Sequence, residues 1–176
     1  MNMQRGVSRS VLWLILMVAW LAGLVACRPR EIPLSFETIE KGEFPPETPQ
    51  HYESKVPKLV IISGAADIVE LSHSVSPKAE AVLRELNFSQ YFAVAVFQGL
   101  KPWANYSVEI RQIIYQDNTV TIYAHFSEPK PGTQLPAVET SPYHLVEVLK
   151  EGLSANKEFI LDADGTTVDH QTHTLP

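Results

Sequence analysis

Few side chains in this sequence have the type and spacing that nucleophilic catalysis requires. Ser63 stands before Gly64 at the end of an apolar run, and a serine hydroxyl becomes a nucleophile where a general base lies beside it. The sequence has no Gly-x-Ser-x-Gly segment, which presents the nucleophile in many hydrolases. A turn that ends a strand explains Ser63 better. A catalytic triad is defined by positions in space, so the sequence leaves one open, but we expect a protein that is not an enzyme.

Metal-binding residue types are present but scattered. The sequence has no Cys/His cluster and no His-Glu-x-x-His segment, which are the patterns typical of zinc sites. Asp162-x-Asp164-Gly165, followed by Asp169, is similar to part of a calcium loop but lacks the third ligand before the glycine and the closing glutamate. A plain Asp-Gly turn is the better interpretation, and we expect neither a metal nor a cofactor. The scattered histidines are His125, His144, His170 and His173.

The most informative residue is Cys27, the single cysteine of the chain. A basic start and an apolar run over residues 11–26 precede it, as in a secretory signal peptide. The segment Leu24-Val25-Ala26-Cys27 resembles the bacterial lipobox, in which the cysteine is acylated on sulfur and becomes the new N-terminus. We therefore predict a signal peptide at residues 1–26 and a membrane anchor of acyl chains, such as palmitate, at Cys27.

An uncleaved transmembrane helix is the alternative to lipidation. The apolar run has 16 residues, which is short of the roughly 20 that span a bilayer. Arg28 and Arg30 could stop transfer, so this alternative stays open. Both interpretations place the rest of the chain on the far side of a bacterial cytoplasmic membrane, and we expect a lipid-anchored, extracytoplasmic location.

The charge of the chain argues against one class of partner. Removing residues 1–26 takes away two arginines and no acidic residue, so the net charge falls from −6 to −8. Binding to nucleic acid relies on clustered Lys and Arg that neutralise phosphates, and no basic run follows Arg30. We therefore expect no nucleic-acid partner, and no membrane contact beyond the anchor.

Composition divides the exported part into three segments. Residues 27–57 are rich in Pro, Glu and Thr and predict an extended tether. The alternative is a partly ordered arm, in which Leu34, Phe36 and Ile39 dock onto the domain. A folded domain is expected at residues 58–165, and residues 166–176 are expected to form a frayed polar tail.

Periodicity within the domain predicts an α+β fold, mostly antiparallel β-sheet with one main helix. Ser76 and Pro77 have the types expected at a helix start, and the helix should reach about residue 87. Alternating residues at 106–113 and 119–126, joined by Asp117-Asn118, predict a β-hairpin with one solvent-facing side. Further strands are expected at residues 59–62, 91–97, 143–149 and 159–161.

Several segments in order give the chain a family resemblance. They are Phe88-Ser89, Val94-Ala95-Val96-Phe97-Gln98-Gly99, Tyr106-Ser107-Val108-Glu109-Ile110, Pro129-Lys130-Pro131-Gly132 and Thr140-Ser141-Pro142-Tyr143-His144-Leu145-Val146. This order resembles the C-terminal domain of the PrcB family, named for a protease-complex subunit, over about residues 59–150. The resemblance implies a lipoprotein with a non-catalytic role beside a protease or another envelope protein. The family's glycine pair before the tyrosine is replaced here by Ala104-Asn105, of which Asn105 more readily adopts a positive φ.

The resemblance and the residue types suggest where a partner would bind. Trp103 lies in a Pro-containing loop, and Trp is common among interface hot spots, although it could instead cover one end of the hairpin. We expect loops 99–105 and 129–143 to form a contact surface for another envelope protein, such as a protease. A small-ligand pocket inside the sheet is the alternative function. The expected partner-binding residues are Trp103, Asn105, Tyr106, Pro142 and Tyr143.

Overall fold

The computed structural model of the chain describes residues 30–44 and 48–176, so the predicted signal peptide and Cys27 lie outside the described residues. Residues Glu31–Pro176 form one compact unit. No helix among the described residues is long and apolar enough to cross a membrane. The elements of this part, in chain order, are β1 (Ile32–Pro33), β2 (Phe36–Phe44), β3 (Lys58–Ile62), α2 (Ala65–Leu71), α3 (Pro77–Glu85), β4 (Tyr91–Phe97), β5 (Ser107–Gln116), β6 (Thr119–Ser127), β7 (Ser141–Leu149), β8 (Ala155–Ala163) and β9 (Thr166–Leu175).

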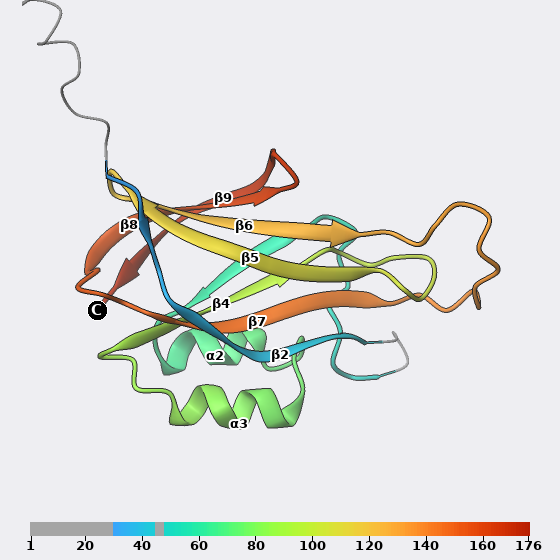
Figure 1. The fold of residues 1–176 in the computed structure, drawn as a ribbon. Coiled ribbons are helices and arrows are strands. Elements are labelled where there is room, and N and C mark those ends of the chain that lie inside the picture. Colours follow the sequence, from blue (N-terminus) through green and yellow to red (C-terminus); the bar gives the residue numbers. More distant parts are fainter. Residues whose placement is uncertain (1–29, 45–47) are drawn as a thin grey trace, which may run out of the picture. The chain divides into compact units, whose positions relative to one another are not determined.

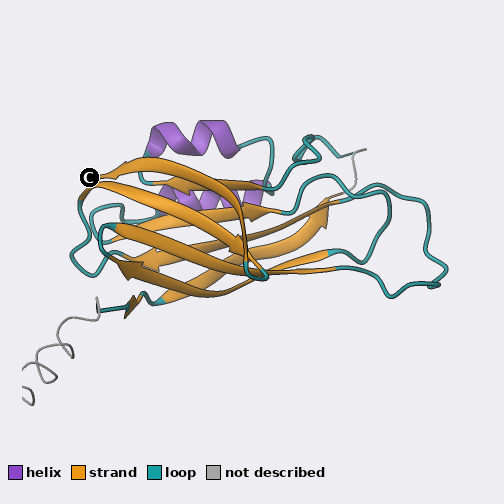
Figure 2. Cartoon of the chain, turned by 90° about the horizontal axis from the view of Figure 1, so that it is seen from above, coloured by secondary structure: helices purple, strands orange, loops and turns teal. Residues whose placement is uncertain are grey.

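The unit is a three-layer α+β structure in which two sheets face each other and the helices cover one of them (Figures 1 and 2). One sheet has the strand order β1-β5-β6-β8-β9 and the other has the order β2-β7-β4-β3. Every pairing is antiparallel except that of β6 with β8, which is parallel. The α+β class and the mostly antiparallel pairing are therefore as the sequence predicts.

Two cores hold the layers together. On β4, Phe92, Val94 and Val96 face the core between the sheets, whereas Ala93 and Phe97 face the core under the helices. Strand alternation sends neighbouring side chains to opposite faces, and both faces of β4 are covered. Burial on both faces explains the uninterrupted apolar sequence of this strand, and the strand predicted at residues 91–97 is confirmed.

The helical layer contains one more helix than the sequence predicts. Helix α3 begins where expected: the Ser76 side chain accepts a hydrogen bond from the backbone N–H of Ala79, and Pro77 is the first helical residue. Helix α2 was not predicted. It is a short helix of 7 residues, and Ile68 and Leu71 are its buried side chains. Two buried positions give too little periodicity to reveal a helix in sequence.

The predicted hairpin is confirmed as β5 and β6. Its turn residues Asp117 and Asn118 both have positive φ, 49° and 73°, which the right-handed twist of a two-residue hairpin requires. The register shifts between Ile110 and Gln112, which marks a β-bulge at Arg111.

Both ends of the compact unit differ from the prediction. Residues 32–44 of the predicted tether form β1, paired with β5, and β2, paired with β7, so they belong to the sheets. Leu34 is buried in the core between the sheets, as the alternative of a docked arm anticipated. The predicted frayed tail is wrong, because residues 166–175 form β9 and pair with β8 along their length.

Side chains of β9 also close the sandwich against the edge of β3. The carboxylate of Asp169 accepts a hydrogen bond from the Leu59 N–H at 2.7 Å, and Gln171 donates to the Leu59 carbonyl at 3.0 Å. These contacts occupy backbone groups of an edge strand that would otherwise be open to another chain.

Candidate functional site

The loop that carries Trp103 follows β4 and is fixed at both ends. Gly99 has a φ of +86°, and a Cβ at this position would lie 2.5 Å from the Lys55 carbonyl oxygen, so only glycine fits. The Lys101 N–H donates to the Thr140 carbonyl at 2.8 Å, and the Thr140 N–H donates back at 2.9 Å. The Thr140 hydroxyl then donates to the Trp103 carbonyl oxygen at 3.1 Å. The loop therefore has a defined conformation.

The opposing loop lies between β6 and β7, and a tight turn shapes it. Pro131 and Gly132 occupy the turn, Gly132 with a φ of +82°, as a type II turn requires. The Thr133 N–H and hydroxyl both donate to the Lys130 carbonyl oxygen, at 3.2 and 2.8 Å.

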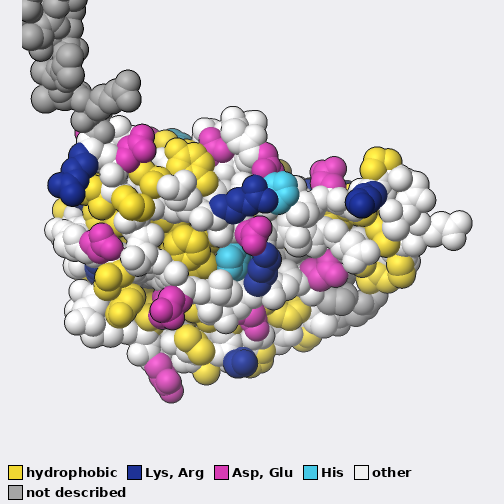
Figure 3. Space-filling view, viewed as in Figure 1, with side chains coloured by type: hydrophobic (Ala, Val, Ile, Leu, Met, Phe, Trp, Pro, Cys, Tyr) yellow, Lys and Arg dark blue, Asp and Glu magenta, His cyan; other side chains and the backbone are white. Residues whose placement is uncertain are grey.

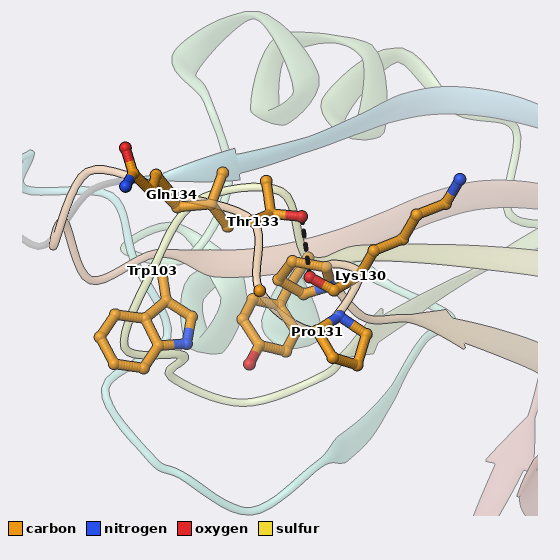
Figure 4. A pocket seen from close by; sticks show the side chains of 9 residues that line it. Trp103, Lys130, Pro131, Thr133 and Gln134 are labelled. Carbon is orange, nitrogen blue, oxygen red and sulfur yellow. Dashed lines mark hydrogen bonds between the residues drawn. The ribbon is translucent and has the colours of Figure 1, made fainter.

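The two loops enclose an open groove, which we call the Trp103 groove (Figure 4). Its volume is about 430 Å³. Trp103 comes from one loop, and Lys130, Pro131, Thr133 and Gln134 come from the other (Figure 4). The Trp103 side chain is 44% exposed, although tryptophan is largely buried in most proteins. The lining residues are Trp103, Tyr106, Pro129, Lys130, Pro131, Gly132, Thr133, Gln134 and Leu135.

Tyr106 separates the Trp103 groove from a second one. Residues 41–43 of β2 line the second groove together with Asn105, Tyr106 and Ser107, and its volume is about 370 Å³. We call it the Glu43 groove. Asn105 has a φ of +71°, so it adopts the left-handed conformation considered for it in the sequence. Lys101 Nζ lies 5.6 Å from the centre of the Tyr106 ring, within the range of a cation–π contact.

Three of the five expected binding residues thus come together, and two do not. Trp103, Asn105 and Tyr106 border these grooves, whereas Pro142 and Tyr143 are buried in β7. The Tyr143 ring stacks on Phe44 and its hydroxyl donates to Glu40 at 2.6 Å. Burial, followed by this hydrogen bond, raises the pKa of the Tyr143 phenol above its usual value. Tyr143 packs under the helices and is not part of an exposed surface.

The candidate nucleophile Ser63 has a histidine and a carboxylate beside it, but their arrangement is not that of a catalytic triad. The Ser63 hydroxyl lies 2.7 Å from His173 Nε2. In a triad the carboxylate holds the other ring nitrogen of the histidine. Here Asp67 Oδ2 instead accepts from the N–H of Ser63 at 2.7 Å and from its hydroxyl at 3.2 Å. The cluster joins the start of α2 to β9, and Ser63 is 7% exposed.

The acidic residues considered as calcium ligands each contact a different donor. Asp162 accepts from the Gly165 N–H within the β8–β9 turn, and Asp169 accepts from β3. Asp164 lies 2.6 Å from His125 Nδ1 and accepts from the Phe126 N–H at 3.1 Å. His170 contacts Glu158 at 3.4 Å. Residues 30–44 and 48–176 contain no group of three or more His, Cys, Asp or Glu side chains that could hold a metal ion.

The buried His144, which the sequence shows only as one of several scattered histidines, links the two sheets. His144 on β7 is 4% exposed, and its Nδ1 accepts a hydrogen bond from the Ile110 N–H at 2.8 Å. This N–H lies beside the register shift between Ile110 and Gln112. Nε2 lies 2.9 Å from the Thr38 hydroxyl and carries the proton, because Nδ1 is an acceptor. Burial, assisted by the charge of Lys41, lowers the pKa of His144 to about 4, so the ring is neutral near pH 7.

The side chains on one face of the unit carry both signs of charge. Figure 3 shows Lys and Arg interspersed with Asp and Glu over this face. Lys41 lies 3.6 Å from Glu109, and Arg111 also lies 3.6 Å from Glu109. The basic side chains on this face therefore lie beside acidic ones.

Comparison with known proteins identifies the segment that contains both loops. Residues 92–148 match the family model described as PrcB C-terminal. This range begins in β4, includes the whole β5–β6 hairpin and ends in β7. No curated protein and no solved structure matches the chain. The chain therefore carries a PrcB C-terminal domain at residues 92–148.

Proposed function

We propose that this protein is a lipid-anchored component of a bacterial cell envelope whose PrcB C-terminal domain binds another envelope protein and does not itself catalyse a reaction. The observation that carries the proposal is Trp103, a 44% exposed indole at the wall of an open groove. Buried at an interface, an indole contributes a large apolar area, and Trp is over-represented among hot spots.

The fixed backbone of both loops supports a role in binding. Hydrogen bonds at Lys101, Thr140 and Thr133 hold the walls of the groove in the absence of a partner. A surface that is already ordered loses little conformational entropy on association. An envelope protease is the first partner to test, because the family is named for a protease-complex subunit.

The proposed location rests on the signal-like residues before Cys27 and on the resemblance of Leu24-Val25-Ala26-Cys27 to a lipobox. Acylation at Cys27 would hold the domain at the outer side of the cytoplasmic membrane or at another envelope membrane, with the domain in an extracytoplasmic compartment.

The test compares three forms of the full chain: wild type, Trp103→Ala and a matched control. Each is purified from detergent-solubilised native membranes, and the proteins that co-purify with it are identified. Tyr123→Ala is the control, because Tyr123 is also aromatic and 40% exposed but lies on β6, away from the groove. We expect one envelope protein to co-purify with the wild type and with Tyr123→Ala, and to be lost from Trp103→Ala. The purified pair should then show the same pattern of dissociation constants. Equal recovery by all three proteins would refute the proposal.

Small-ligand binding in the same groove is the second candidate function. The volume of about 430 Å³ falls within the range of small-molecule pockets and favours it. Native mass spectrometry of the full chain, released from detergent, distinguishes the two functions. A bound small molecule that is lost with Trp103→Ala would favour the ligand; a protein bound in a fixed ratio favours the accessory role.

A further inference from the structure

Glu43 lines the Glu43 groove, and one oxygen of its carboxylate has no partner within the described part of the protein. Glu43 Oε2 is buried and has no hydrogen-bond partner among the described residues. Gln98 Oε1 is the other buried side-chain atom of this kind in residues 30–44 and 48–176. Buried polar atoms nearly always have partners, so an orphan acceptor beside a groove indicates a missing donor.

Strand register places both atoms at one end of the sandwich. Gly42 lies opposite Tyr143, and a Cβ at Gly42 would lie 3.9 Å from the Tyr143 ring, so Gly42 faces the helices. Alternation then turns Glu43 to the opposite face, toward the other sheet. Pro142 is opposite Glu43, and its carbonyl oxygen accepts from the Gln98 N–H. Glu43 and Gln98 therefore flank Pro142 in one cross-strand row.

The nearby cations are engaged elsewhere. Lys41 also lines the Glu43 groove, but its Nζ lies 3.6 Å from Glu109. Lys101 lies over the Tyr106 ring. Glu43 forms no ion pair with any residue in the part of the chain that the structure describes. A donor to Glu43 Oε2 is therefore a water molecule or a group of a partner, and not one of these residues.

We infer that the Glu43 groove receives a basic side chain, Lys or Arg, from an extended segment of the partner that binds in the Trp103 groove. Tyr106 lines both grooves, so an extended chain that passes beside Tyr106 reaches both. The segment places an apolar residue against Trp103, and its basic residue pairs with the Glu43 carboxylate, which takes up the donor as the side chain turns toward the groove. This inference rests on the proposed function and adds the chemistry that the partner must present.

The expected effect follows from the charge of the pair. A hydrogen bond between a cationic donor and a carboxylate is about twice as strong as a neutral one. Glu43→Gln keeps the shape of the side chain and removes its charge. It should therefore weaken binding of a basic side chain about tenfold. Glu37→Gln is the matched control, because Glu37 is exposed on the same strand and does not line the Glu43 groove.

The test uses N-acetyl-arginine amide as the probe and N-acetyl-citrulline amide as its neutral isostere. Each is titrated into the ¹⁵N-labelled full chain in detergent micelles, with the backbone amides of Glu43, Tyr106 and Ser107 as reporters. We expect saturable shifts with the arginine probe and about tenfold weaker binding of the citrulline probe. Glu43→Gln should abolish this difference and Glu37→Gln should preserve it.

Two results would overturn the inference. Equal affinity of the two probes for the wild type would exclude recognition of charge. The absence of saturable shifts with the arginine probe at millimolar concentrations would leave a water molecule as the partner of Glu43 Oε2. Either result, combined with loss of the co-purifying protein in Trp103→Ala, would refute this inference alone. If Trp103→Ala also retained that protein, the proposed function would fail with it.

Discussion

Acidification should destabilise the fold through His144, because the ring is buried in its neutral form and a proton added to it has no acceptor at Nδ1. Protonation would place a hydrogen on Nδ1, where the Ile110 N–H already donates at 2.8 Å. Two donors would then face each other inside the sandwich, and the hydrogen bond that joins the sheets would be lost. The perturbation is a fall in pH from 7 to 5.

The magnitude follows from the difference between the folded and unfolded pKa. The pKa of His144 is about 4 in the folded protein, against an ordinary value of 6.5. Because the folded pKa is the lower one, the unfolded chain binds the proton first as the pH falls. Stability is at its full value above pH 6.5 and declines as the pH falls toward 4. The total loss is about 3 kcal/mol, and about 2 kcal/mol of it is reached by pH 5.

The assay is urea unfolding of the full chain in detergent, followed by circular dichroism of the β-sheet, at pH values from 7.5 to 5. His144→Asn is the matched variant, because its side-chain oxygen can accept from Ile110 and does not titrate. The variant should be less stable at pH 7.5 but should lose about 2 kcal/mol less than the wild type on going to pH 5. Carboxylates and the other histidines contribute similarly to both proteins. Parallel pH dependences of wild type and variant would refute the reasoning.

Three further predictions concern residues with defined roles. Gly99→Ala should lower the free energy of unfolding, measured in urea, by about 2 kcal/mol or more. Residue 99 has a positive φ, and a Cβ there would lie 2.5 Å from the Lys55 carbonyl oxygen. An unchanged free energy of unfolding would contradict this loop geometry. Tyr143→Phe should cost about 1–2 kcal/mol in the same assay, because it leaves Glu40 without one donor, and an unchanged stability would show that this bond contributes nothing. Cys27→Ser should abolish incorporation of an alkyne-labelled fatty acid, and continued labelling would exclude Cys27 as the anchor.

Local patterns allowed much of the central fold to be predicted. The β5–β6 hairpin follows from alternation and from two turn residues that tolerate positive φ. Helix α3 follows from its Ser76–Pro77 start. In both cases the decisive interactions lie within a few residues in sequence, where periodicity and capping report them directly.

The two ends were misjudged because their partners are distant in sequence. Strand β2 pairs with β7, and Thr38 is opposite Val146. A Pro-containing segment with few apolar residues becomes ordered only when such a partner exists. Strand β9 lies at a sheet edge and has a largely polar sequence, and two of its polar side chains, Asp169 and Gln171, bond to the backbone of β3. Composition alone does not report either pairing.

The candidate site was predicted only in part, because its arrangement also depends on contacts between residues that are distant in sequence. Trp103 is conspicuous by residue type, but its position opposite residues 129–135 depends on the pairing of Lys101 with Thr140. Pro142 and Tyr143 looked like surface residues because a loop leads into them. The helices and β2 cover this part of β7, which no local pattern indicates.

The central claim is that Trp103 anchors a protein partner, and the most direct measurement is the affinity of the purified pair for wild type, Trp103→Ala and Tyr123→Ala. Removing an indole that becomes buried at an interface should cost about 2 kcal/mol or more, which corresponds to a dissociation constant about thirtyfold higher. The account predicts this increase for Trp103→Ala and an unchanged constant for Tyr123→Ala. Dissociation constants that are the same for all three proteins would contradict it.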